Sequence, residues 1–233
     1  MKQARKERQQ AAIREEIKAM ARAHMARDGA AALSLRAVAS DLGLSSAAIY
    51  YYYANRDALI TALIIDAYRA LAAALRGADP GPAERLDDRL FAVMRAYRAW
   101  ALATPAEFEL IFGAPIPGYH APAEVTAPEA RAALHTFGEL FGLAFAEGRL
   151  RPPAEGPPAT VAAHIEAWGR DNGQAAPPPV MLAMLQAWSV GHGMVALELN
   201  GQLQPLIGDP GPFYDYSLGG LLRSFGLAPA PAE

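Results

Sequence analysis

Four consecutive tyrosines, at residues 50–53, are the part of the sequence with the clearest chemistry. A tyrosine hydroxyl can donate a hydrogen bond to a phosphate oxygen, and small residues on a helix let its backbone approach base edges. Two small residues, Ser46 and Ala47, lie one turn before the tyrosines. Because a helix turns about 100° per residue, the first two tyrosines share their side, whereas the last two share the side of Ile49. We therefore expect an exposed strip, suited to a DNA groove, that consists of Ser46, Ala47, Tyr50 and Tyr51.

Short helices with capping residues must hold this strip, and the sequence provides them. Ser34 and Ser45 can each cap a short helix, since a serine oxygen accepts from a backbone N–H of the first turn. Gly43 lies between the two helices, where a left-handed turn residue is needed. Asn55 can cap a longer helix over 56–76. Two short helices joined by a glycine turn predict a helix-turn-helix unit.

Residues that could bind the DNA backbone lie at the starts of the helices. Free N–H groups there attract phosphate, and Ser34, Arg36 and Arg56 occupy such positions. Residues 1–60 hold ten Lys or Arg against six Asp or Glu, whereas the rest of the chain holds eleven against eighteen. This asymmetry is typical of a chain whose two parts have different partners, although a solvated basic helix gives the same count.

The segment SLRAVASDLGLSSAAIYYYYANRDALI, residues 34–60, resembles the DNA-binding segment of the TetR family of transcriptional repressors. The resemblance covers about residues 10–70. It implies that the strip faces DNA and that Ser34, Ser45 and Arg56 hold phosphates.

The segment also departs from the family pattern. Ala47 and Ala48 replace a common Gly-Thr pair, and Tyr51 and Tyr52 stand where basic or histidine residues are more usual. We therefore expect fewer charged contacts from this helix, and a weaker dependence of DNA affinity on salt, than a recognition helix rich in Lys and Arg shows.

Helical periodicity continues through the rest of the chain, so the predicted fold class is all-α. The proline- and glycine-rich stretch GADPGP, residues 77–82, is the best domain boundary. We predict a basic N-terminal arm (1–9), a helix-turn-helix DNA-binding domain (10–70, motif near 33–52) and a larger helical domain for ligand binding and dimerisation (77–227). Helices beyond the boundary are expected near 83–103, 105–112, 127–147, 159–169, 178–200 and 210–225.

The composition of the chain argues against metal-binding, membrane and secreted proteins. The chain has no cysteine, and its five histidines show no paired spacing for a metal, so we expect no metal and no cofactor. No run of 18 uncharged apolar residues occurs, and the N-terminus lacks an apolar signal segment. We expect a cytoplasmic protein without a membrane partner.

The second domain is rich in aromatic residues, which suit a cavity for a small, mostly apolar ligand. An aromatic stripe at helical spacing is equally the pattern of an ordinary core. Residues 96–113 and 187–203 resemble a TetR-family C-terminal domain named for its Trp-His-Gly signature, which implies a helical domain that receives ligand and dimerises. The candidate ligand-binding residues are Tyr97, Trp100, Phe108, Phe112, Phe137, Phe141, Trp188 and His192.

His192 lies on an apolar segment between two glycines, where it could bind ligand or simply pin the helix into the core. An alternative is an all-α enzyme that pairs His192 with Glu198 or Asp215, but no nucleophile-base set has plausible spacing. A helical small-molecule-binding protein or adaptor without DNA function is the other alternative.

The last two long helices are apolar on much of their surface, which favours a homodimer through a four-helix bundle. A dimer would place two recognition helices in successive major grooves, roughly 34–36 Å apart. The sequence thus predicts a ligand-responsive regulator that binds a palindromic double-stranded DNA operator and is released by a small-molecule effector. Its resemblance to the TetR family implies a repressor.

Overall fold

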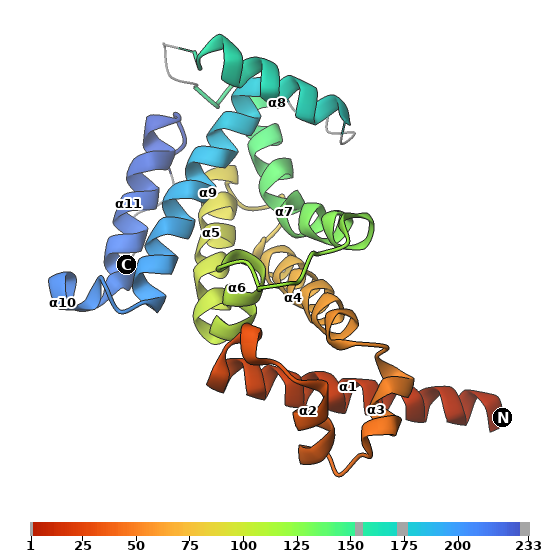
Figure 1. The fold of residues 1–233 in the computed structure, drawn as a ribbon. Helices are drawn as coiled ribbons and strands as arrows, with labels where there is room; N and C mark the ends of the chain where they lie inside the picture. Colours follow the sequence, from red (N-terminus) through yellow and green to blue (C-terminus); the bar gives the residue numbers. More distant parts are fainter. Residues whose placement is uncertain (1, 152–155, 172–176, 229–233) are drawn as a thin grey trace. The chain divides into compact units, whose positions relative to one another are not determined.

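A computed structural model of the chain describes residues 2–151, 156–171 and 177–228 (Figure 1). These residues form α-helices and one short 3-10 helix and contain no β-strand, which confirms the predicted all-α class. The helices of the first half are α1 (Lys2–Asp28), η1 (Ala30–Ala32), α2 (Leu35–Asp41), α3 (Ser46–Tyr52), α4 (Arg56–Ala78) and α5 (Leu86–Ala103). The second half contains α6 (Pro105–Phe112), α7 (Ala123–Ala146), α8 (Ala159–Asp171), α9 (Pro178–Leu199), α10 (Gln204–Ile207) and α11 (Pro210–Ser224).

The chain packs as two compact units. The first contains residues 1–70 and 104–130, and the second contains residues 71–103 and 131–233. Helix α6 packs in the first unit, where Leu110 joins the core. The predicted domain ranges stay a prediction, because a compact packing unit need not fold or function by itself.

Local sequence explains the three short elements of the first unit. The Oγ atom of Ser34 accepts a hydrogen bond from the Ala37 N–H, and that of Ser45 accepts one from the Ala48 N–H at 3.1 Å, so both predicted caps are confirmed. Gly43 has a φ of 65°, which a residue with a Cβ rarely adopts. These features end α2 and start α3 within four residues, so the two helices form the predicted helix-turn-helix.

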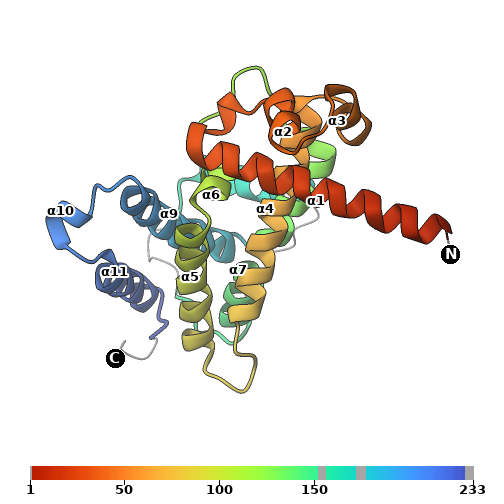
Figure 2. The same ribbon diagram turned by 90° about the horizontal axis from the view of Figure 1, so that it is seen from below.

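The core of the first unit holds α3 in place. Helices α2 and α3 lie on one side of α1, whose N-terminal turns continue past them (Figure 2). Ile49 is the fully buried residue of α3. It packs in a cluster of aliphatic side chains from α1, α2 and α4 that includes Ile17, Ala21, Val38, Leu59 and Leu63.

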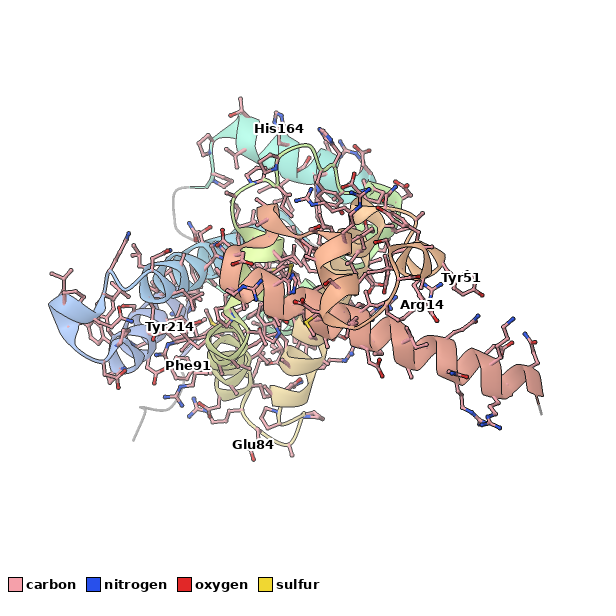
Figure 3. The ribbon with its side chains drawn as sticks, turned by 60° about the horizontal axis from the view of Figure 1, so that its bottom comes forward. Arg14, Tyr51, Glu84, Phe91, His164 and Tyr214 are labelled. Carbon is pink, nitrogen blue, oxygen red and sulfur yellow. The ribbon has the colours of Figure 1, made fainter. Side chains whose placement is uncertain are left out.

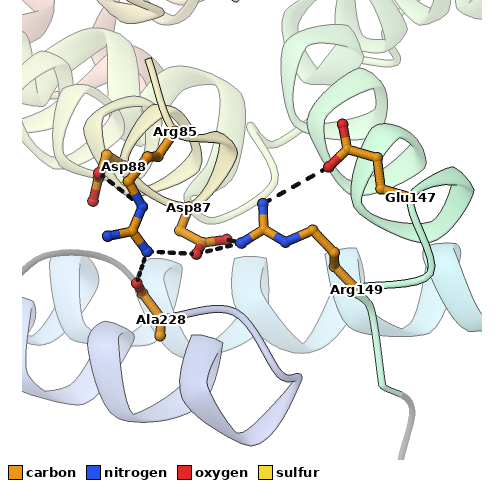
Figure 4. A network of polar contacts seen from close by, with 6 residues as sticks. All are labelled: Arg85, Asp87, Asp88, Glu147, Arg149 and Ala228. Atoms are coloured by element: carbon orange, nitrogen blue, oxygen red, sulfur yellow. Dashed lines mark hydrogen bonds and ion pairs between the residues drawn. The ribbon is translucent and has the colours of Figure 1, made fainter.

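Helices α5, α9 and α11 pack against one another in the second unit. A buried carboxylate joins distant parts of this unit. Asp87, at the start of α5, is 1 % exposed and pairs with Arg149 and Arg85 (Figure 4). Arg85 also donates to the backbone oxygen of Ala228 at 3.0 Å. This network therefore fixes the chain that follows α11 to the start of α5.

Two helices, α4 and α9, are long and apolar enough to cross a bilayer by length and composition alone. The core helix of a soluble protein has the same composition. The buried side of α4 packs on the first unit through Leu59, Ile60 and Leu63, which are at most 1 % exposed.

Candidate nucleic-acid interface

The outer side of α3 carries the strip that the sequence predicted. Tyr50 and Tyr51 are 45 % and 64 % exposed, and Ser46 and Ala47 are exposed as well. Tyr53, immediately after the helix, is 6 % exposed. The four tyrosines therefore divide as helical geometry requires, and the small residues and two phenol rings share one accessible side.

Three of the predicted phosphate-binding residues are accessible at helix starts. Ser34 and Arg36 are exposed at the beginning of α2, and Ser45 is exposed at the beginning of α3. Each serine uses its oxygen as an acceptor in capping, which leaves its O–H free to donate to a phosphate. The geometry thus permits capping and phosphate binding by the same side chain, although the DNA contacts themselves stay predictions.

Arg56 has a different environment from the one expected. Its Nε atom donates to the Leu33 oxygen at 2.9 Å, and its Nη2 atom donates to the oxygens of Ala30 and Ala31 at 3.2 and 2.8 Å. The guanidinium therefore ties the start of α4 to the turn before α2. Its predicted contact with phosphate stays a prediction, and the structure gives it a positioning role that spacing alone did not indicate.

Helix α1 supports the strip from the side. The Nε2 atom of Gln10 donates to the Tyr51 hydroxyl oxygen at 2.6 Å, and the Arg14 guanidinium lies over the Tyr53 ring, 5.7 Å from its centroid. Figure 3 labels Arg14 on α1 and Tyr51 on α3. Sequence reasoning missed Gln10. The available signal was the spacing of four between Gln10 and Arg14, which places both on one side of α1.

Comparison with known proteins gives two matches that together span most of the chain. Residues 17–63 match the model of bacterial regulatory proteins of the tetR family. Residues 90–221 match a tetracyclin repressor-like C-terminal domain, which alone covers more than half of the chain. This chain belongs to the TetR family.

Whole-length relatives agree with the TetR assignment. The HTH-type transcriptional regulators Mb1846 of Mycobacterium bovis and Rv1816 of Mycobacterium tuberculosis are each 35 % identical over 208 residues, covering 87 % of this chain and 89 % of the relative. The solved structure of SCO4313 is 35 % identical with a TM-score of 0.77, covering 93 % of this chain and 98 % of that one. A tetR-family protein from Rhodococcus RHA1, at 19 % identity and a TM-score of 0.65, shares the fold.

The TetR chain is accordingly a DNA-binding transcriptional regulator and not an enzyme. In the structure, arginines bind both carboxylates that the enzyme alternative named. Glu198 binds the Arg98 guanidinium through both oxygens at 2.7 and 2.6 Å, and Asp215 pairs with Arg95. The Trp-His-Gly subtype of the C-terminal domain stays a prediction.

Four of the eight candidate ligand residues meet in the second unit of this TetR regulator. Tyr97, Phe137, Trp188 and His192 line a cavity of about 10 Å³, roughly the room of one water molecule. The Tyr97 hydroxyl lies 2.7 Å from His192 Nδ1, and the Trp188 ring centroid lies 4.9 Å from that of His192. Burial lowers the pKa of His192 and raises that of Tyr97, which favours the neutral form of both. The space between these side chains is far smaller than a small-molecule site.

The other four candidates do not line this cavity. Phe141 is fully buried against Phe225, and Trp100 is 7 % exposed. Phe108 and Phe112 belong to the first unit, where their ring centroids lie 5.4 Å apart. Aromatic periodicity could not separate core from pocket, because both place rings on one side of a helix.

A larger cavity, which the sequence did not indicate, lies within the first unit. It measures about 400 Å³ and is formed by α4, α6, the loop 113–121 and the first turns of α7. The Tyr119 hydroxyl on that loop lies 2.9 Å from Thr61 Oγ1 of α4, which holds the loop against the helix. Its lining includes Ile64, Tyr68, Leu110, Ile116, Tyr119 and Thr126.

Proposed function

We propose that this TetR regulator is a homodimeric repressor that binds a palindromic operator through α3 and is released by a small, uncharged, mostly apolar effector. The observation that supports DNA binding most directly is the strip on α3. Its phenol rings are about half exposed or more, while Ile49 on the same short helix is fully buried. A helix capped at Ser45 and anchored by one buried residue is a rigid support for side chains that enter a major groove.

Exposed apolar residues on α9 and α11 support dimerisation through these two helices. Leu185, Val190 and Leu197 on α9 are 38 to 41 % exposed, and Phe213 and Tyr216 on α11 are 40 % and 74 % exposed. A two-fold axis through such a surface buries the same residues from both copies. The same axis would relate the α3 helices of the two copies. A palindromic operator has the same two-fold symmetry, so each α3 would meet an equivalent half-site.

The 400 Å³ cavity of the first unit is the best candidate for the effector site. Its volume is within the range of small-molecule sites, and its lining contains no charged side chain. Tyr68 and Tyr119 supply hydroxyls that can orient a polar group, and burial raises the pKa of both, so both are neutral. An uncharged, largely apolar molecule fits these walls.

Coupling between effector and DNA is reciprocal. Helix α4 contributes Ile64 and Tyr68 to the cavity, and one turn earlier Ile60 belongs to the core that holds α3. An effector that favours a different position of α4 would therefore change the support of α3. By linkage, the operator would weaken effector binding by the same factor.

Selection of bound duplexes from a random pool tests the DNA function. The wild-type protein is expected to enrich an inverted repeat, bound by one dimer in sedimentation. Ala47→Glu places a carboxylate on the strip, where it repels phosphate, so enrichment should be lost. Ala73→Glu adds the same charge on an exposed position of α4 and should leave enrichment intact. Absence of an enriched sequence for wild type, or equal enrichment by Ala47→Glu, would contradict the proposal.

Filling the cavity tests the effector site. The uncharged dye Nile red is expected to bind the wild-type protein and to fluoresce there. Ala127→Phe, whose side chain enters the cavity from α7, should abolish this binding, whereas Ala132→Phe on an exposed position of the same helix should not. Nile red binding that is equal in both variants would place the effector elsewhere.

A further inference from the structure

The N-terminal turns of α1 extend beyond the core as an exposed basic segment. Residues 3–9 are exposed, and Ile13 is the first α1 residue to pack against the core cluster. The segment carries Arg5, Lys6 and Arg8 with a single acidic residue, Glu7. None of the three basic side chains pairs with another described residue. This segment therefore presents uncompensated positive charge.

The position of Lys6 follows from two contacts further along α1. Lys6, Gln10 and Arg14 are spaced by four residues, so they form one row on the helix. Arg14 lies over Tyr53, and Gln10 donates to Tyr51, so this row faces α3 (Figure 3). Lys6 continues the row one turn past the last contact, about 6 Å further along the helix axis.

Arg8 has the same charge as Lys6 but a different direction. It lies two residues further along α1, a rotation of about 200°, and so points to the opposite side of the helix. Both side chains are exposed, and both belong to the same segment. A substitution of Arg8 therefore removes the same charge as a substitution of Lys6, but from the opposite side of α1.

We propose that Lys6 binds a backbone phosphate of the duplex that α3 reads, adjacent to the phosphates within reach of Tyr51. The inference rests on the proposed DNA function and adds a second contact outside the helix-turn-helix. A lysine ammonium is a compact charge that binds phosphate without reading sequence. The α3 strip contains no Lys or Arg, so Lys6 supplies charge beside a recognition surface that is otherwise neutral. The contact should strengthen binding without changing the preferred sequence.

The salt dependence of DNA affinity tests the contact. Affinity is measured by fluorescence anisotropy for a duplex that wild type enriches, from low to moderate salt, for wild type, Lys6→Gln and Arg8→Gln. Glutamine has nearly the helix propensity of lysine and arginine, so helicity should be retained, which circular dichroism checks. Lys6→Gln is expected to reduce the slope of log K against log salt by about 1 per contact, and so by about 2 per dimer. Arg8→Gln should change the slope by less than half as much.

Hydroxyl-radical footprinting locates the phosphate. Lys6→Gln should lose protection next to the bases that contact α3 and retain it at those bases. The inference is overturned if both variants have the same slope, because the effect would then be long-range charge, or if Lys6→Gln equals wild type. In either case wild type still binds DNA, so the proposed function survives. Wild-type protein that enriches no duplex overturns both.

Discussion

Tyr214 of α11 lies directly over Gly191 of α9. A Cβ built on Gly191 would stand 3.3 Å from the Tyr214 hydroxyl oxygen, closer than an ordinary van der Waals contact. That hydroxyl donates to the backbone oxygen of Met94 on α5 at 2.8 Å, so it cannot move away freely. Because Gly191 has no side chain, the Tyr214 hydroxyl of α11 can pass α9 and reach the backbone of α5.

Alanine at Gly191 should therefore lower stability, whereas alanine at Gly193 should not. No atom lies within 4 Å of a Cβ built on Gly193. Gly193→Ala should gain about 0.5–1 kcal/mol from helix propensity. Gly191→Ala should lose more than this gain through overpacking, which costs about 1–3 kcal/mol. Urea unfolding of both variants measures the difference, and equal midpoints would show that Tyr214 can shift without cost.

Alanine at Arg56 should lower stability, whereas alanine at Arg36 should weaken DNA binding without lowering stability. Arg56 donates to three backbone oxygens, and hydrogen bonds from a charged group contribute about 1.5–3 kcal/mol. Arg56→Ala should lower the unfolding free energy by that order. Arg36→Ala, at an exposed position, should leave stability within about 0.5 kcal/mol and weaken DNA binding uniformly across sequences. Calorimetry measures the stability of both variants, and fluorescence anisotropy measures their DNA affinity. A large loss of stability in Arg36→Ala would contradict the role of Arg36 as a surface residue.

The Tyr50 hydroxyl should matter for DNA and not for folding. Tyr50→Phe keeps the exposed ring but loses the donor to phosphate, so affinity should fall several-fold while the melting temperature stays unchanged. Tyr52→Phe, on the side of α3 that packs against the core, is the matched control and should keep full affinity. Equal affinities for wild type and Tyr50→Phe would remove this hydroxyl from the interface.

His192 should make the protein less stable in mild acid. Burial lowers its pKa from the ordinary 6.5, so the folded state keeps the ring neutral while the unfolded state binds a proton more readily. The contribution is fully present above the unfolded pKa of about 6.5 and is lost as the pH falls through the lower folded pKa. Unfolding free energies from pH 8 to pH 5 should fall more steeply for wild type than for His192→Gln. Parallel curves would mean that the folded ring titrates normally.

Features that depend on neighbours in the sequence could be predicted, and most of the DNA strip is of this kind. The caps at Ser34 and Ser45 and the left-handed Gly43 each need only two or three adjacent residues. The division of the tyrosines follows from helical rotation alone. These determinants act within one turn, so no knowledge of tertiary packing was required.

Features that join distant segments could not be predicted. Arg56 reaches carbonyl oxygens 23 to 26 residues earlier, and Gln10 reaches Tyr51 across 41 residues. The 400 Å³ cavity combines α4 with a loop some fifty residues later, so no single segment carries its pattern. Phe108 and Phe112 pack with the first unit although they follow α5 of the second, a pairing that chain order conceals.

The hydrogen bond from Gln10 to Tyr51 has a consequence for how the ring meets a partner. The phenol oxygen already accepts from an amide, so its own proton is left to be donated outward. The side chain is also restrained in the free protein, and the rotational entropy lost in fixing it no longer opposes association. Gln10 thereby holds the Tyr51 ring in place, with its hydroxyl proton available for donation, before nucleic acid binds.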